Sequence, residues 1–387
     1  MRSNHGSGAC RWISAEPDPA QVQTLAASLD CPRWLAGLLV GRGLSSPDIV
    51  QKWLDPKLKD LAEPFLLPGM DAAVDRILAA IQRRESITVF GDYDVDGLTG
   101  VALLASLLQH AGSPFKTFLP HRLDEGYGLS VEALDRCLTE TSPSLIVTVD
   151  CGTGSVAAVE QARSRGVDVI ITDHHAVSEG VAPALSVVNP RLSPDESMHV
   201  LAGVGVAFKL CHALLKRGRQ LPDAPAWTLF DPKDVLDLVA LGTVADLVPL
   251  TGENRLLVHH GLKALNRTKR PGLNALIKVA GIKKQIDTYE VGYLLGPRLN
   301  ASGRLGTAQT SLKLLLTGSN AEAEKIAAEL DAANRDRQGV DDLVVQNGPW
   351  RTPVEVADSG ANRMQDVPVT AALVAQQRAP AAAAQPP

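Results

Sequence analysis

The chain has 387 residues, of which 45% are hydrophobic and 21% charged, and its formal net charge at pH 7 is −5. This composition is typical of a globular protein with two domains, and the negative charge excludes a protein that binds polyanions over its whole surface. No stretch approaches the roughly 20 apolar residues of a membrane span, so we expect no membrane association. The 5 scattered cysteines exclude a disulfide framework and favour a cytoplasmic protein.

The first part of the chain is predicted to lead into the main domain. Residues 1–11 are expected to be disordered. Residues 12–81 are expected to be helical, because apolar residues recur at helical spacing within 22–29, 34–39 and 72–81.

Residues 82–250 predict an α/β domain. Short runs rich in β-branched residues indicate buried strands, and helical segments alternate with them. The strand runs are 87–90, 145–149 and 167–172, and the helical segments are 98–110, 131–138 and 156–165. This alternation is typical of a parallel sheet with helices on both faces.

Acids or histidines follow each of the three strand runs. The first run leads into residues 91–97, Gly-Asp-Tyr-Asp-Val-Asp-Gly, the second ends at Asp150, and the third ends at residues 173–175, Asp-His-His. The carboxyl ends of parallel strands meet at one edge of a sheet, where ligands bind. Crowded carboxylates repel one another unless a cation holds them. We therefore predict a metal site at this edge.

A fourth acid is expected to join this site. Asp246 lies in the mostly apolar segment 235–249, and a buried carboxylate needs a partner such as a metal or a histidine. Carboxylates and imidazole without paired cysteines suit Mn²⁺ or Mg²⁺ better than structural zinc. Two such ions about 4 Å apart can activate a shared water and neutralise charge on a phosphorus centre.

Some neighbouring residues have a different interpretation. An aspartate after a strand is often a helix cap, so we expect Asp92 to cap the following helix or to orient its neighbours, and we expect Asp173 to support a histidine. Neither is placed among the metal ligands. Gly203 and Gly205 precede a helix, where they either cradle a phosphate through backbone amides or allow a tight helix entry.

Several segments, in order along the chain, resemble the signature of the DHH phosphoesterases. They are 91–97, 149–152, 173–175 and 244–246. Two further segments, 201–210 and 296–305, resemble the bacterial single-strand-specific DNA exonucleases of that family. The resemblance covers about residues 12–338 and assigns the catalytic DHH domain to 82–250.

The resemblance implies an exonuclease that hydrolyses phosphodiester bonds from the 5′ end of single-stranded DNA in recombination and repair, with two Mn²⁺ or Mg²⁺ ions per site. In the implied scheme Asp150 bridges the ions. His175 faces the substrate, where its imidazolium stabilises the phosphoryl charge or protonates the leaving oxygen. The other implied ligands are Asp94 on one ion and Asp96, His174 and Asp246 on the other. Some family members carry a histidine at the position of Phe90, so the first ion has one ligand fewer here.

Substrate-binding residues are also implied. By resemblance Arg298, Asn300 and Arg304 bind the phosphates of the nucleotide, with salt bridging as the alternative. Residues 261–286 carry several lysines and arginines and no acid, so this stretch is either a track for a DNA backbone or a solvated basic face. Single-strand-binding protein and a helicase are conceivable partners that the sequence leaves open.

Two other functions compete with this one. A small-substrate phosphoesterase of the same family would act on short oligonucleotides, cyclic dinucleotides or pyrophosphate, with little dependence on strand length. A non-catalytic partner-binding module would have no use for crowded charges, so the complete set of acids and histidines argues against it.

The last part of the chain departs from the family. Residues 251–338 are predicted to be helical and to end in a connector at 321–337. Residues 339–387 form an atypical tail rich in Ala, Pro, Val and Gln that is expected to be disordered, in place of the second DHH-associated domain and an oligonucleotide-binding barrel. Their absence implies a chain that binds metal, hydrolyses DNA poorly and exposes apolar surface around 321–330.

Overall fold

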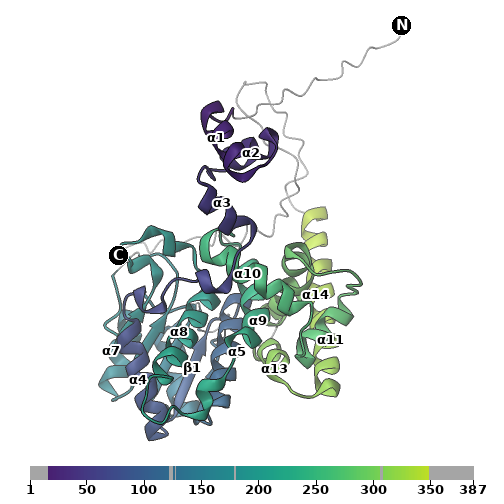
Figure 1. Ribbon diagram of the computed structural model, residues 1–387. Helices are drawn as coiled ribbons and strands as arrows, with labels where there is room; N and C mark the ends of the chain where they lie inside the picture. The colour runs from purple at the N-terminus through teal and green to yellow at the C-terminus, as the bar shows by residue number, and fades with distance from the viewer. Residues whose placement is uncertain (1–15, 122–124, 127, 178–179, 306–307, 348–387) are drawn as a thin grey trace, which may run out of the picture.

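The structure is a computed structural model that describes residues 16–347 except 122–124, 127, 178–179 and 306–307 (Figure 1). The side chains of 303–305 and 339–347 also lie outside the described part. The predicted disorder of 1–11 and of 348–387 therefore falls on residues that are not described. None of the helices in the described part combines the length and apolar character that a membrane crossing requires.

The centre of the molecule is a five-stranded, all-parallel sheet with the order β2-β1-β3-β4-β5. Its strands are β1 (Ile87–Gly91), β2 (Phe115–Phe118), β3 (Leu145–Val149), β4 (Asp168–Thr172) and β5 (Ser186–Val188). Gly91 pairs with Val149, and Val149 pairs with Thr172, so β1, β3 and β4 end level with one another. The predicted parallel α/β fold is confirmed, and β2 and β5 are additions to the predicted strands.

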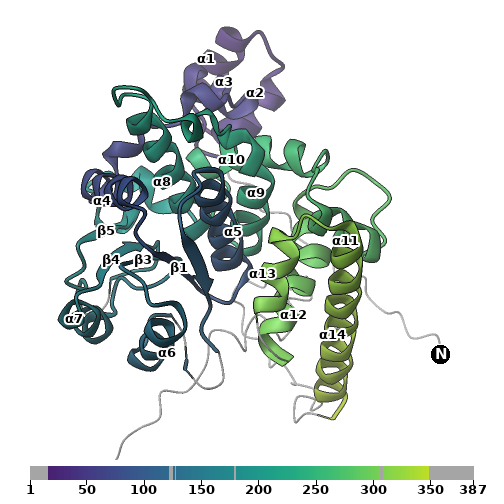
Figure 2. The ribbon, with the colours of Figure 1, turned by 90° about the horizontal axis from the view of Figure 1, so that it is seen from below.

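Helices cover both faces of the sheet because its central strands are buried on both sides. Successive side chains of a strand point to opposite faces: Val89 packs in the core with α4, α5 and α8, whereas Phe90 packs in a second core with α6 and α7. Figure 2 shows α6 and α7 on one side of the strands and α5 and α8 on the other. These helices are α4 (Met70–Arg83), α5 (Val95–His110), α6 (Val131–Thr141), α7 (Val156–Ser164) and α8 (Gly203–Gly218).

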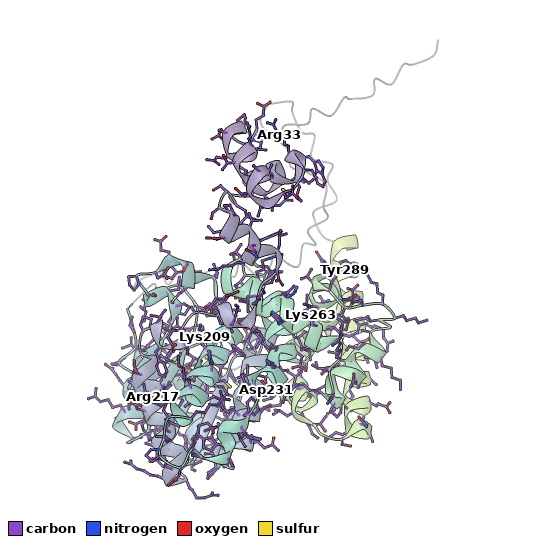
Figure 3. The ribbon with its side chains drawn as sticks, viewed as in Figure 1. Arg33, Lys209, Arg217, Asp231, Lys263 and Tyr289 are labelled. Carbon is purple, nitrogen blue, oxygen red and sulfur yellow. The ribbon has the colours of Figure 1, made fainter. Side chains whose placement is uncertain are left out.

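The predicted helical lead-in forms a small bundle with its own core, at the top of Figure 1. It consists of α1 (Pro19–Leu29), α2 (Arg33–Val40) and α3 (Pro47–Leu54). Below it, the fully buried Lys209 of α8 donates hydrogen bonds from Nζ to the carbonyl of Ala62 at 2.7 Å and to Oε1 of Glu253 at 2.9 Å. Figure 3 labels Lys209 in the body of the molecule. This buried ion pair joins the segment after the bundle to α8 and α10.

The chain beyond the sheet is helical, as predicted. It contains α9 (Leu236–Ala245), α10 (Gly252–Leu265), α11 (Pro271–Val279), a π-helix η7 (Glu290–Leu295), α12 (Gly296–Leu305), α13 (Gln309–Leu316) and α14 (Asn320–Asn347). Short 3-10 turns connect other parts of the fold: Leu58–Asp60, Pro64–Leu66, Pro190–Leu192, Glu196–Val200, Ala226–Leu229 and Pro232–Val235.

Helix α14 corrects two expectations. Its apolar residues Ala323, Ile326, Ala327 and Leu330 are at most 5% exposed and belong to the main core, where α14 packs against α11, α12 and α13. The exposed apolar surface predicted at 321–330 is therefore wrong, because neighbouring helices of this same chain cover that face. The helix also continues to Asn347, so residues 339–347 are helical where a disordered tail was expected.

The close approach of α11 to α13 depends on a glycine. A Cβ atom added at Gly272 would clash with the backbone carbonyl of Leu314, which cannot rotate away, whereas a Cβ at Gly292 meets no atom within 4 Å. We expect Gly272→Ala to lower the free energy of unfolding by about 1–3 kcal/mol through overpacking. Gly292→Ala is the matched control and should have little effect. Urea unfolding curves compare the two, and equal midpoints would contradict this packing.

Candidate metal centre

The predicted acids meet at the point where the sheet topology changes direction. From β1 the chain continues into α5 on one face, whereas from β3 it continues into α7 on the other face, and β1 and β3 are neighbours. In a doubly wound sheet this arrangement opens a crevice at the carboxyl ends of the two strands, where ligands bind. Asp92, Asp94 and Asp150 follow these strand ends directly.

Asp94 and Asp96 are fixed by helix N-termini. The side chain of Asp94 caps α5 by accepting a hydrogen bond from the amide of Gly97 at 3.0 Å. Asp96, which is 1% exposed, accepts from the amides of Gly203 at 2.6 Å and Val204 at 2.8 Å and so caps α8 from another helix. Because Asp96 occupies those amides, the phosphate cradle considered for Gly203 and Gly205 is not formed, and the tight helix entry is the correct interpretation.

Asp150 lies at the centre of the cluster in an unusual backbone conformation. Its φ of 65° is in the left-handed region, which costs free energy for a residue with a side chain and is frequent at functional sites. The turn directs its buried carboxylate toward the histidines. Oδ1 of Asp150 lies 3.1 Å from Nε2 of His174 and 3.9 Å from Nδ1 of His175.

One group of donor atoms surrounds Nε2 of His174. Besides Asp150, this nitrogen lies 3.6 Å from Oδ2 of Asp246 and 3.8 Å from Oδ2 of Asp96. Nε2 of His174, Oδ1 of Asp150 and Oδ2 of Asp246 are buried and have no hydrogen-bond partner among the described residues. Burial, followed by the charge of His175, lowers the pKa of His174 to about 4, so its imidazole is neutral and can ligate a metal. Asp96, His174 and Asp246 therefore can hold one ion.

A second group consists of carboxylates alone. Donor oxygens of Asp92, Asp94 and Asp150 lie within 4.8 Å of one another, and Asp92 is fully buried. Asp92 was not predicted as a ligand, although its position directly after β1 was the signal that could have included it. Phe90 contributes no ligand, because its side chain points into the opposite core and stacks on Phe118 at 5.2 Å. Asp150 belongs both to this group and to the one around the histidines, as its predicted bridging role requires.

Asp173 positions His175, as expected. Its Oδ1 lies 2.7 Å from Nδ1 of His175 and accepts from the amide of His174, while Oδ2 accepts from the amide of Thr153. Burial alone would lower the pKa of His175, but the hydrogen bond and charge of Asp173 outweigh it and raise the pKa. The side chain of His175 remains 43% exposed. It therefore lies on the exposed side of the cluster, with its protonated form favoured by Asp173.

Without a cation the acids oppose one another. Burial, followed by the charge of Asp94, raises the pKa of Asp246 to about 7. Burial raises the pKa values of Asp96 and Asp150 well above the ordinary range, and neighbouring carboxylates raise them further. A divalent cation would supply the missing opposite charge and coordinate the oxygens that lack hydrogen bonds. The donor set, oxygen with one or two imidazole nitrogens, fits Mn²⁺ or Mg²⁺.

The three residues predicted to bind phosphate differ in what the structure describes of them. Nε of Arg298 pairs with Asp331 at 2.9 Å and its Nη1 donates to the carbonyl of Leu294 at 2.7 Å, which is the salt-bridging alternative. Asn300 is half-buried on α12, and the side chain of Arg304 lies outside the described residues. Arg191 was not predicted as a site residue; it is an exposed cation whose Nε donates to the carbonyl of His174 at 3.4 Å.

The basic stretch 261–286 is partly neutralised. Three of its cations form ion pairs: Arg270 with Asp237, Lys278 with Glu324 and Lys284 with Glu290. The others are at least partly exposed and have no acidic partner among the described residues: Lys263, Arg267, Lys269 and Lys283. The cations of this stretch that lack an acidic partner are therefore separate positions and do not form a continuous basic track.

A doubly wound sheet that gathers aspartates and histidines at its switch point defines an α/β domain with a metal centre. Residues 86–243 match the family model described as "DHH family, N-terminal domain". Over 362 residues the chain is 39% identical to the single-stranded-DNA-specific exonuclease RecJ of Bacillus subtilis (strain 168), an alignment that covers 91% of this chain and 44% of the relative. It is 38% identical over 328 residues to the protein of the same name from Escherichia coli (strain K12), covering 82% of this chain and 56% of the relative.

Solved structures of RecJ proteins are also similar to this chain. A crystal structure of exonuclease RecJ bound to manganese is similar with a TM-score of 0.65 and 39% identity, over 72% of this chain and 69% of that one. RecJ from Thermus thermophilus in complex with Mn²⁺ gives a TM-score of 0.75 and 34% identity, over 89% of this chain and 48% of that one. The chain belongs to the DHH family and, within it, to the RecJ family. It spans about half the length of the curated relatives that it matches.

Metal binding should stabilise the protein, because the ions bind a set of ligands that exists only in the folded state. At a free Mn²⁺ concentration of about 100 times the dissociation constant we expect a gain of about 2.7 kcal/mol. Asp150→Asn should abolish this gain and, without metal, unfold at a higher temperature than the wild type, since it removes one of the mutually repelling charges. Calorimetry with and without Mn²⁺ measures both effects. An Asn variant that still responds to Mn²⁺ would contradict the proposed centre.

A glycine of α8 lies directly against the carboxylate of Asp150. An added Cβ at Gly203 would lie 2.5 Å from Oδ1 and 2.7 Å from Cγ of Asp150, so Gly203→Ala must displace that side chain. We expect it to weaken Mn²⁺ binding at least about tenfold, the lower end of what misplaced metal-site residues cost. Gly205→Ala, on the same helix, meets the Leu201 side chain at 3.3 Å and Oδ1 of Asn254 at 4.0 Å but no atom of the site, and serves as the control. Titration calorimetry distinguishes them, and equal affinities would be the contrary result.

Proposed function

We propose that this chain is a metal-dependent phosphodiesterase that removes nucleotides from the 5′ end of single-stranded DNA in recombination and repair. The observation that carries the proposal is the convergence of Asp150 with both donor groups, one formed with Asp92 and Asp94 and the other around His174. Its RecJ relatives are named as single-stranded-DNA-specific exonucleases, and the alignment with one of them covers 91% of this chain.

The ions would be Mn²⁺ or Mg²⁺, two per site. Asp92, Asp94 and Asp150 would hold one, and Asp96, Asp150, His174 and Asp246 the other. When bound, such a pair lowers the pKa of a water and neutralises charge on the phosphoryl group. Gly203 and Val204 contribute indirectly, since their amides fix Asp96 in the orientation that leaves an oxygen directed at His174.

His175 would act on the substrate itself. Asp173 has only acceptor atoms when ionised, so Nδ1 of His175 carries the proton of their shared hydrogen bond. The raised pKa then favours a second proton on Nε2, the other nitrogen of a ring that is partly exposed. From there the imidazolium can neutralise developing phosphoryl charge or give its proton to the leaving oxygen.

Cations near the centre would bind the other phosphates. Arg298 uses Nε and Nη1 within the protein, so a phosphate would bind through Nη2, and Asn300 and Arg304 of the same helix would assist. Arg191 is a further candidate on the side of the histidines. The chain would act in the cytoplasm, where the free thiols of its described cysteines are stable, and single-strand-binding protein or a helicase could deliver its DNA.

The test is a time course of hydrolysis with Mn²⁺ on a long 3′-labelled single strand, its duplex and a short oligonucleotide. We expect nucleotide release from the single strand and none from the duplex. Asp150→Ala should reduce release more than about a hundredfold, because even residues that only support metal ligands cost 10–100-fold. Asp60→Ala, an exposed aspartate outside the cluster, is the control and should behave as wild type.

Other outcomes identify the competing functions. Equal turnover of long and short strands would favour the small-substrate phosphoesterase. Hydrolysis that persists in Asp150→Ala, or metal binding without cleavage of any of the three substrates, would contradict the proposed activity.

A further inference from the structure

Two tyrosines form an exposed stack at the π-helix η7. Tyr289 and Tyr293 are 56% and 65% exposed, and their ring centroids are 4.8 Å apart with an interplanar angle of 27°. They are four residues apart, close to one helical turn, so both rings project from the same side. The buried residues Val291 and Leu295 anchor the helix in the main core. Exposed aromatic rings that cluster on an anchored element mark a candidate interaction site.

Lysines lie close to the two rings along the chain. Nζ of Lys284 lies 5.8 Å from the ring centroid of Tyr289, and Lys283 is exposed without an acidic partner among the described residues. Hydrogen bonds between Asn266 and Ile286, both at 2.8 Å, hold this segment against the end of α10, which carries Lys263 close by in the chain. Figure 3 shows Tyr289 and Lys263 in the same part of the molecule. Two acids also lie here: Glu290 pairs with the exposed Lys284, and Asp287 accepts from the amide of Tyr289, so Lys283 is the cation of this segment without an acidic partner among the described residues.

The tyrosines are also close to the metal centre along the fold. Gly296, directly after η7, packs against Ala245, whose Cβ lies 3.5 Å from the position of a Cβ on the glycine. Ala245 precedes Asp246, and Tyr293 precedes Gly296 by less than one helical turn. The segment that carries Tyr293 therefore leads directly into the contact with the residue next to Asp246.

We propose that Tyr289, Tyr293, Lys283 and Lys284 form a surface that binds the bases and backbone of a single strand leaving the metal centre. Aromatic rings stack on bases of any sequence, and nearby lysines neutralise the phosphates, which is how proteins bind single strands without sequence preference. We call these four residues the tyrosine surface. The proposal extends the proposed function, because it specifies how the strand is held next to that site.

The test is fluorescence anisotropy with labelled dT12 in EDTA, where no hydrolysis occurs, and with an abasic strand of equal length and charge. Replacing both tyrosines by alanine should weaken dT12 binding about tenfold or more, since base stacking contributes about a tenfold factor or more per base. The abasic strand should bind the wild type and this variant equally. Tyr289→Phe with Tyr293→Phe keeps both rings and should bind dT12 within about twofold of wild type.

Two further variants complete the design. Trp34→Ala removes a ring that is 67% exposed on α2, away from the tyrosine surface, and should leave dT12 affinity unchanged. A plot of log affinity against log salt concentration has a negative slope. Lys283→Gln should make this slope shallower by about 0.7, the value for one phosphate contact on a single strand.

The proposal is overturned if the double alanine variant binds dT12 like the wild type, or if the wild type does not distinguish dT12 from the abasic strand. Circular dichroism melting confirms that the variants are folded, and the phenylalanine pair keeps the test decisive if the alanine pair unfolds. Binding is measured without metal, so the two proposals fail separately. If the chain does not hydrolyse DNA, only the proposed function is contradicted. If the double alanine variant binds dT12 with wild-type affinity, only the tyrosine surface is contradicted.

Discussion

The arrangement of the site depends on one buried carboxylate. Asp96 comes from α5, accepts hydrogen bonds from the first amides of α8 and lies against α9, where a Cβ on Gly242 would be 2.9 Å from its Oδ1. The partial positive charge of a helix N-terminus offsets part of the cost of burying this carboxylate, although burial and the neighbouring acids still raise its pKa. In this way one side chain fixes the relative positions of three helices. Asp246, at the end of α9, reaches His174 because those helices are held at this distance.

The sequence predicts the parts of this arrangement that are local. The β-branched runs of β1, β3 and β4 are fully or largely buried, as expected of central parallel strands, and polar residues at their ends must share an edge. β2 and β5 escaped prediction because they are short strands at the two edges of the sheet, with only 4 and 3 residues. Their patterns are too brief to distinguish from loops.

What the sequence left open concerns contacts between distant segments. Asp92 was expected to act as a cap or to orient its neighbours, but the pairing of β1 with β3 also brings Asp150 beside it and Asp94. Arg298 pairs with Asp331 on α14, 33 residues away along the chain. The apolar face of α14 packs against α11, α12 and α13, and sequence periodicity does not predict which helices pack together. The basic stretch looked uniform in the sequence, and folding supplied acids to some of its cations from α9, η7 and α14.

The buried ammonium of Lys209 sets the size of the smallest piece of this chain that can fold by itself. One of its acceptors precedes the segment matched by the family model, 86–243, and the other follows it. A fragment trimmed to that segment would retain the lysine inside α8 and lose both Ala62 and Glu253. A buried charge that has lost its partner strongly lowers the free energy of unfolding. The autonomous folding unit is therefore larger than the segment that defines the family, and useful truncations keep the chain from before Ala62 to beyond Glu253.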